Sequence, residues 1–156
     1  MNEKTDETSE TSLYTLIGGE TTVRALVKRF YELMDTLPEA RSIRKMHTDD
    51  LSGIEEKLFL YLTGWLGGPQ LYIEKYGHPM LRARHLPFSI GMGEVKQWLI
   101  CMRRTLEETI PDPSLRAHID SALTGLALHM RNRTDSKPQD QVPDSSDSSG
   151  NTASVS

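Results

Sequence analysis

One short basic segment in the middle of the chain carries the residues best suited to chemistry. Between Gly77 and Phe88, His85 follows closely on Arg82 and Arg84 and stands just before a proline. A neutral imidazole is an axial ligand of haem iron, and the planar guanidinium of arginine pairs with carboxylates through two hydrogen bonds. The segment could therefore bind a haem, with the imidazole on iron and the arginines on the propionates. Taken alone, it could equally be a solvated turn.

Composition limits the class of protein. A chain of 156 residues with 37% hydrophobic content suits one compact domain plus some tail. The net charge of −4 and the pI of about 5.7 argue against a nucleic-acid-binding surface, which needs a clustered basic face. There is neither an apolar run long enough to cross a membrane nor a signal-peptide stretch, and Cys101 is the only cysteine, which fits a reducing compartment. We therefore expect a cytoplasmic protein that binds neither nucleic acid nor membrane.

The two ends of the chain differ in composition from its middle. Residues 1–12 and 134–156 are rich in Ser, Thr, Asp, Glu, Gln and Pro and offer almost nothing to bury. We expect a disordered N-terminal extension and a disordered Ser/Asp-rich tail. The body, residues 13–133, has no internal repeat and no alternating strand pattern, and its apolar residues recur at helical spacing. The pattern predicts one all-α domain.

Apolar stripes and helix-breaking residues predict four long helices. They are expected between Gly18-Gly19 and Pro38, between Asp49-Asp50 and Gly67-Gly68-Pro69, from about Gly93 to Thr109, and from about Ser114 to Arg131. Their stripes comprise Val23, Leu26, Val27, Phe30 and Met34; Leu51, Ile54, Leu58, Leu62 and Trp65; Val95, Trp98, Met102 and Leu106; and Leu115, Ile119, Leu126 and Met130.

A long passage, from Gly67 to Gly93, separates the second and third helices and shows only short helical segments. Connections in helical bundles usually have about two to eight residues. An enclosed cofactor would explain how such an irregular region is held to the core. A functional loop or a groove for a partner would explain it as well.

The order of several motifs resembles that of the group II truncated haemoglobins. The motifs are Gly18-Gly19, Arg29-Phe30-Tyr31, Gly67-Gly68-Pro69, Arg84-His85-Leu86-Pro87-Phe88 and Trp98-Leu99-Ile100-Cys101-Met102. Each is weak alone, and the resemblance, over about Leu13 to Met130, is specific in combination. It implies a shortened globin in which two helices pack over two around haem b (iron protoporphyrin IX). The function it implies is reversible binding of dioxygen and other diatomic gases such as NO and CO.

The resemblance assigns roles to the basic segment. It makes His85 the iron ligand, with its second ring nitrogen donating to a backbone carbonyl that fixes the ring. Arg84 is expected on the propionates first, followed by Arg82 and by the phenol of Tyr72. All three could instead face solvent. His78, in a Gly-His-Pro turn, is expected at the rim.

Three polar residues are expected over the other face of the haem: Tyr31, His47 and Trp98. A phenol, an imidazole and an indole can each donate a hydrogen bond to a gas that gains negative charge on binding. From periodicity alone, Tyr31 and Trp98 would be ordinary core residues with wet polar tips. At the position of His47 many relatives hold Tyr or Phe, and a histidine there could also bind iron as a sixth ligand.

Apolar residues complete the expected pocket. Ile54 appears in place of the distal histidine of many globins, with Leu58 one turn later, so both offer only apolar contact. Phe88 is expected in the wall of the pocket together with Met80, Ile90 and Leu99.

The physiological role stays open at this level, because the haem itself supplies the chemistry. A polar pocket favours redox detoxification of nitric oxide or peroxide, which would require a reductase partner. The alternatives are a cofactor-free helical interaction module and a gas sensor that acts through a separate partner. A monomer or a weak homodimer is expected.

Overall fold

The computed structural model describes residues 12–134. Helices are the only regular secondary structure in this part of the chain. The predicted extension and tail lie outside this range, apart from residues 12 and 134. The elements are α2 (Leu13–Ile17), α3 (Gly19–Thr36), the 3-10 helix η1 (Pro38–Ala40), α4 (Arg41–Lys45), α5 (Ser52–Trp65), α6 (Leu71–Tyr76), α7 (Leu81–His85), α8 (Met92–Thr109) and α9 (Pro113–His129). In residues 12–134 no helix combines the length and the apolar character needed to cross a membrane.

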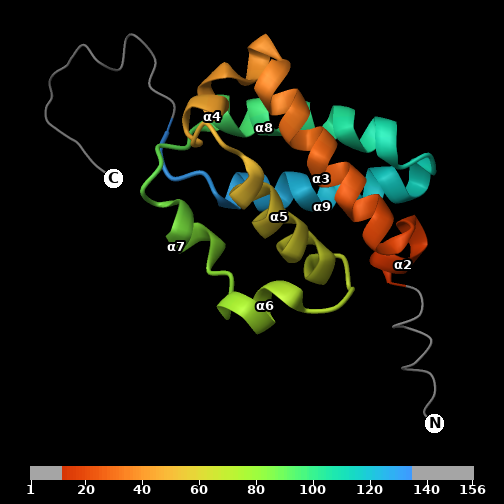
Figure 1. The fold of residues 1–156 in the computed structure, drawn as a ribbon. Helices are drawn as coiled ribbons and strands as arrows, with labels where there is room; N and C mark the ends of the chain where they lie inside the picture. Colours follow the sequence, from red (N-terminus) through yellow and green to blue (C-terminus); the bar gives the residue numbers. More distant parts are fainter. Residues whose placement is uncertain (1–11, 135–156) are drawn as a thin grey trace, which may run out of the picture.

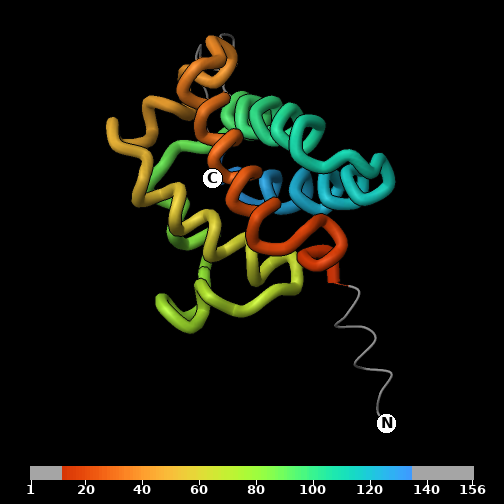
Figure 2. The backbone as a smooth tube through the Cα atoms, turned by 45° about the vertical axis from the view of Figure 1, so that its right-hand side comes forward, coloured from red at the N-terminus to blue at the C-terminus, as the bar shows by residue number. Residues whose placement is uncertain are grey.

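The four long helices pack as two pairs. Helix α3 packs on α5 in one pair, α8 packs on α9 in the other, and α3 also packs on α8 (Figure 1). Figure 2 shows α8 and α9 running back along each other after a short turn, with α3 crossing them. The short helices α6 and α7 lie on the α5 side of the molecule. This is the two-over-two arrangement that the resemblance implied, and the all-α prediction is confirmed.

Side chains near the helix starts explain where the elements begin. Asp112 caps α9, because its Oδ1 accepts hydrogen bonds from the backbone N–H groups of Ser114 and Leu115 at 2.8 and 3.2 Å, and Pro113 occupies the first turn. Asp50 accepts from the Ser52 N–H at 2.9 Å at the start of α5, and this bond lowers the pKa of its carboxyl. The predicted boundaries of these helices are therefore correct to within one or two residues.

The predicted stripes are not all buried to the same extent. The stripe of α3 is fully buried, as are the α8 and α9 residues Met102 and Ile119. On α5, by contrast, Leu62 is buried but Ile54 and Leu58 are only half-buried. These two residues border a cavity, in keeping with the apolar pocket contact expected for them.

The chain reverses between α2 and α3 at Gly18, whose φ is +117°. The Gly18 N–H caps α2 by donating to the Thr15 carbonyl at 3.2 Å. A side chain at this φ is strained, and its Cβ would also collide with the side chain of Thr22. Gly53, by contrast, lies exposed in the first turn of α5 with nothing within 4 Å of a built Cβ.

These two glycines give a matched test of the fold. Gly18→Ala should lower the free energy of unfolding by about 1–3 kcal/mol, because it combines backbone strain with a collision. Gly53→Ala should raise it by up to about 1 kcal/mol, because alanine is the better helix former. Urea unfolding followed by far-UV circular dichroism measures both. A Gly18→Ala protein as stable as the original would contradict the left-handed turn.

Candidate functional site

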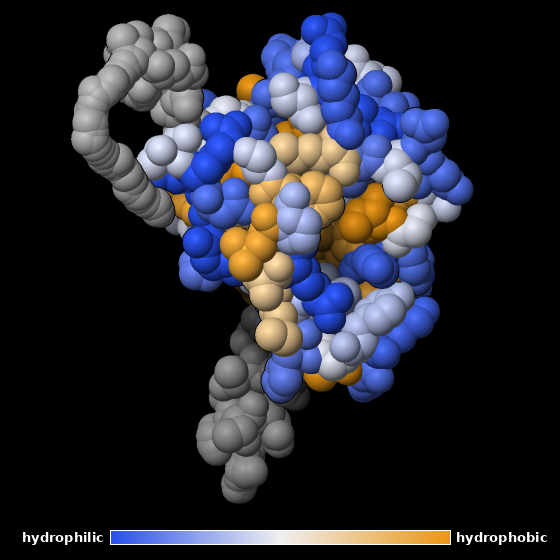
Figure 3. Space-filling model, turned by 90° about the vertical axis from the view of Figure 1, so that its left-hand side faces the viewer, coloured by the Kyte–Doolittle hydropathy of each residue, from blue (hydrophilic) through white to orange (hydrophobic). Residues whose placement is uncertain are grey.

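A cavity of about 550 Å³ opens between the two helix pairs. Cofactor sites typically enclose about 300–1,000 Å³ and are lined mainly by apolar side chains. Figure 3 shows apolar side chains gathered in and beside a recess that hydrophilic side chains frame. The lining residues are Tyr31, Ile43, Met46, His47, Ile54, Lys57, Leu58, Tyr61, Leu62, Tyr72, Leu81, Arg84, His85, Phe88, Ile90, Glu94, Val95, Trp98, Leu123, Leu126, Ala127 and Met130. Of the residues expected to bind or enclose the haem, all except Arg82, Met80 and Leu99 are among them.

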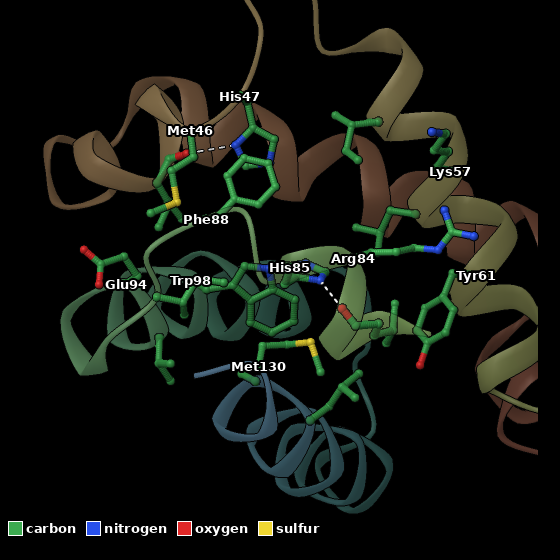
Figure 4. A pocket seen from close by; sticks show the side chains of 18 of the residues that line it. Met46, His47, Lys57, Tyr61, Arg84, His85, Phe88, Glu94, Trp98 and Met130 are labelled. Atoms are coloured by element: carbon green, nitrogen blue, oxygen red, sulfur yellow. Dashed lines mark hydrogen bonds between the residues drawn. The ribbon is translucent and has the colours of Figure 1, made fainter. Parts of the chain in front are cut away.

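Helix α7 presents the imidazole of His85 to this cavity (Figure 4). The ring is half-buried, and its Nδ1 lies 2.6 Å from the carbonyl oxygen of Leu81, one helical turn earlier. A carbonyl only accepts, so Nδ1 carries the proton and donates. In the neutral ring, Nε2 then keeps its lone pair. This is the tautomer that a histidine ligand needs, with its orientation fixed through the other ring nitrogen.

Tyr31 and Trp98 are positioned by one aromatic cluster. The ring of Phe30, fully buried, lies 4.9 Å from that of Tyr31 and 5.3 Å from that of Trp98, measured between centroids. Within residues 12–134, neither the Tyr31 hydroxyl nor the Trp98 indole N–H has a hydrogen-bond partner. Burial, and less strongly the charge of Glu55, raises the pKa of Tyr31 far above its usual value of 10. The phenol is therefore neutral and keeps its proton as a hydrogen-bond donor.

His47 contacts the same cavity from the turn after α4. Its ring meets that of Tyr31 edge-on at 6.0 Å, and its Nδ1 lies 2.8 Å from the carbonyl oxygen of Ile43. Burial lowers the pKa of His47 below its ordinary value, so the neutral ring predominates at neutral pH. By the argument used for His85, its Nε2 is then an acceptor. The expected imidazole N–H donor is thus engaged with the backbone, which corrects the donor role foreseen for this residue.

Cationic side chains gather at one end of the cavity. Arg84 on α7 and Lys57 on α5 extend toward this end (Figure 4). The Nε of Arg84 donates to the Pro79 carbonyl at 2.7 Å, which directs the rest of the guanidinium, and the Lys57 ammonium lies 5.4 Å from the ring centroid of Tyr76. Tyr72 is buried beside them, with its ring 4.9 Å from that of Tyr76. This end of the cavity is suited to carboxylates.

Arg82 points away from the cavity. Its guanidinium donates to the carbonyl oxygens of His129 and Arg131, at 3.2 and 2.8 Å, beyond the last turn of α9. Backbone carbonyls at a helix C-terminus lack partners within the helix and attract cations. Two of the expected wall residues are also absent from the lining, since Met80 is 64% exposed and Leu99 is buried in the core.

Sequence reasoning missed several lining residues, notably Lys57 and Tyr61 on α5. A lysine on a helix is usually interpreted as a solvent-exposed charge. Residues three and four positions apart share a helix face, however, so Lys57 and Tyr61 lie on the face of Ile54 and Leu58. That spacing was the available signal.

Comparison with known proteins agrees with this geometry. The family described as bacterial-like globin matches residues 12–132. Group 2 truncated hemoglobin YjbI of Bacillus subtilis (strain 168) is 37% identical over 119 residues, which are 76% of this chain and 88% of that protein.

Solved structures are similar over most of the chain. A group II 2-on-2 hemoglobin from Agrobacterium tumefaciens is 54% identical, with a TM-score of 0.78 over 80% of this chain and 96% of the other. A cold-adapted truncated hemoglobin from Pseudoalteromonas haloplanktis TAC125 is 41% identical, with a TM-score of 0.78 over 79% and 99%. The chain therefore belongs to the bacterial-like globins, in the group II truncated haemoglobin family, and is a haem protein that binds diatomic gases.

Proposed function

We propose that this globin holds haem b through His85 and reversibly binds dioxygen, NO and CO beside Tyr31, His47 and Trp98. The observation that carries the proposal is the imidazole of His85, which the short helix α7 presents to the cavity and which is fixed through Nδ1 so that Nε2 keeps its lone pair. Haem b supplies the iron on which these gases bind. The cavity fits such a group, because it combines apolar walls, the imidazole of His85 and a cationic end.

The polar residues of the proposed gas side have different tasks. Tyr31 and Trp98 each offer a proton donor that the described protein does not otherwise use. Donors fixed in an apolar surrounding stabilise negative charge more strongly than water does. His47 instead offers an acceptor nitrogen, so it can orient a donor or serve as a sixth iron ligand. Ile54 and Leu58 exclude water without adding a polar group.

The propionates are assigned to the cationic end. Arg84 provides terminal guanidinium N–H groups, and Lys57 adds a second cation. Tyr72, which also lines the cavity, is the third candidate through its phenol. Phe88 packs in the wall near His85, with ring centroids 6.5 Å apart. We leave Arg82 out of this set because its guanidinium is engaged with α9.

A second candidate function is redox detoxification of nitric oxide or peroxide. The observation that favours it is the pair of donors, Tyr31 and Trp98, in the lining of a mainly apolar cavity, since such donors polarise a bound oxidant. A reductase would then have to return electrons to the haem. We also propose that the protein is cytoplasmic and is a monomer or a weak homodimer. Oxygen carriage and gas sensing through a separate partner are the alternative roles. A cofactor-free module does not fit a globin.

The role of His85 is tested by His85→Gly. We expect the Soret band of the reconstituted protein to weaken or shift, because iron loses its protein ligand, and added imidazole to restore it. Visible absorption of the ferric, ferrous and CO-bound forms is the measurement. His78→Ala is the control, since His78 is exposed in the same passage. An unchanged His85→Gly spectrum would disprove the assignment.

The donors are tested by Tyr31→Phe and Trp98→Phe. Each should speed dioxygen release by about tenfold to a hundredfold, the worth of one hydrogen bond to a charged group. Stopped-flow displacement measures the rate, and Tyr14→Phe, outside the cavity, is the matched control. If the double variant removed NO or peroxide as fast as the original protein, the redox proposal would fail.

The cationic end is tested by Arg84→Ala and Lys57→Ala. Each should speed haem loss by about two- to fivefold, the magnitude of a partly exposed ion pair. Transfer of haem to an excess of another apoglobin gives the rate. Reconstitution with the dimethyl ester of haem, whose carboxyl groups carry no charge, should abolish the difference. A difference that survives esterification would show that these residues do not act on the propionates.

A further inference from the structure

Helix α7 carries His85 but has little to hold it in place. It has only five residues, none of them buried, and no side chain caps its N-terminus. The residue before it, Met80, has a left-handed φ of +47°, the only positive φ of a non-glycine residue in 12–134. A helix this short is not stable by itself in water. Contacts from elsewhere in the fold must therefore fix its position.

The side chain of Asn132, just beyond α9, makes such contacts. Its Nδ2 donates to the carbonyl oxygens of His85 and Phe88, at 3.1 and 2.8 Å, and its Oδ1 accepts from the Ile90 N–H at 2.9 Å. The backbone N–H of Asn132 also donates to the Ile90 carbonyl at 2.8 Å. One residue thus satisfies four backbone groups of the segment that follows the imidazole, 42 to 47 positions away in sequence.

The orientation of this amide is unambiguous. Carbonyl oxygens at His85 and Phe88 require a donor, and the N–H of Ile90 requires an acceptor. Exchanging the oxygen and nitrogen of the amide would set like groups against each other at all three positions. The site therefore accepts a carboxamide specifically, and an isosteric carboxylate would place its oxygen against two carbonyls.

Neighbouring residues tie the same two segments together. Arg82 reaches from α7 to the carbonyls that follow α9. In the other direction, the Arg133 guanidinium donates to Ser89 at 2.5 Å and to Glu94 at 2.8 Å. The side chain of Glu94 in turn accepts from the Gly91 N–H. Of these contacts, only those of Asn132 reach the backbone of His85 itself.

We propose that Asn132 is a positioning residue for the iron ligand. It fixes the carbonyl end of His85, while the bond from Nδ1 to Leu81 fixes the ring, so that together they set the direction in which Nε2 faces the cavity. This inference rests on the proposed role of His85. It adds a residue from outside the cavity lining to the machinery that holds the haem.

The first test measures the hydrogen bonds of this segment directly in the haem-loaded protein, so its outcome does not depend on which residue binds the iron. Amide hydrogen exchange of Asn132→Ala should accelerate about tenfold or more across residues 81–91, since several hydrogen bonds are lost, with little change in α3. Asn132→Asp, nearly equal in volume, should do the same. Ser121→Ala, exposed on α9, is the control. Unchanged exchange in 81–91, or equal acceleration everywhere, would overturn the proposal.

The second test also uses the haem-loaded protein. Asn132→Ala should shift or broaden the iron–histidine stretching band in resonance Raman spectra and speed haem loss about tenfold. In a His85→Gly background supplied with imidazole, the ligand is no longer tethered to α7, so Asn132→Ala should have no further effect on haem loss. An equal effect in that background would show a general structural role and refute positioning. If His85→Gly alone leaves the spectrum unchanged, the proposed function has failed instead.

Discussion

In the proposed site the imidazole of His85 has to stay at one place in a large cavity, and the helix that bears it buries none of its own side chains. Packing of the half-buried Leu81 supplies only part of that fixation, and hydrogen bonds supply the rest. The ring of His85 is bound to Leu81, and the backbone beyond it is bound to Asn132. The wall of the cavity that carries His85 thus depends on the end of α9, which itself is placed by packing against α8. Asn132, near the end of the described chain, therefore contributes to the site.

The cavity also shapes the energetics of the fold. Apolar side chains of α5, α8 and α9 that would close a core in a plain bundle, such as Leu58, Trp98 and Leu126, remain half-buried at its border. Each Å² of apolar surface left uncovered forgoes about 25 cal/mol. A flat apolar group that fills the space recovers this energy only in the folded state. Haem binding and folding are therefore coupled, as for any ligand that binds the native state alone.

The sequence was sufficient to predict the four long helices and most residues of the cavity lining. It was insufficient to predict the contacts that join distant segments. Stripes and breakers located α3, α5, α8 and α9, because helical periodicity is a local property. The resemblance then selected His85, which periodicity could not distinguish from a solvated histidine. The contacts of Arg82 and Asn132 could not be assigned, because their partners are backbone carbonyl and N–H groups 42 to 49 residues away. Nearly every residue carries the same backbone groups, so the residue types do not show which of these groups a side chain will bind.

The two histidines of the cavity make the same kind of hydrogen bond to the backbone, with different consequences. In both, Nδ1 donates to the carbonyl four residues earlier, Ile43 for His47 and Leu81 for His85, so each ring is held as the same tautomer. Each therefore directs a lone pair, rather than a proton, from Nε2. Since burial keeps His47 neutral, it cannot replace the donors of Tyr31 and Trp98. In the proposed function, hydrogen bonding to a bound gas therefore falls to those two residues, and the contribution of His47 is an acceptor or a ligand.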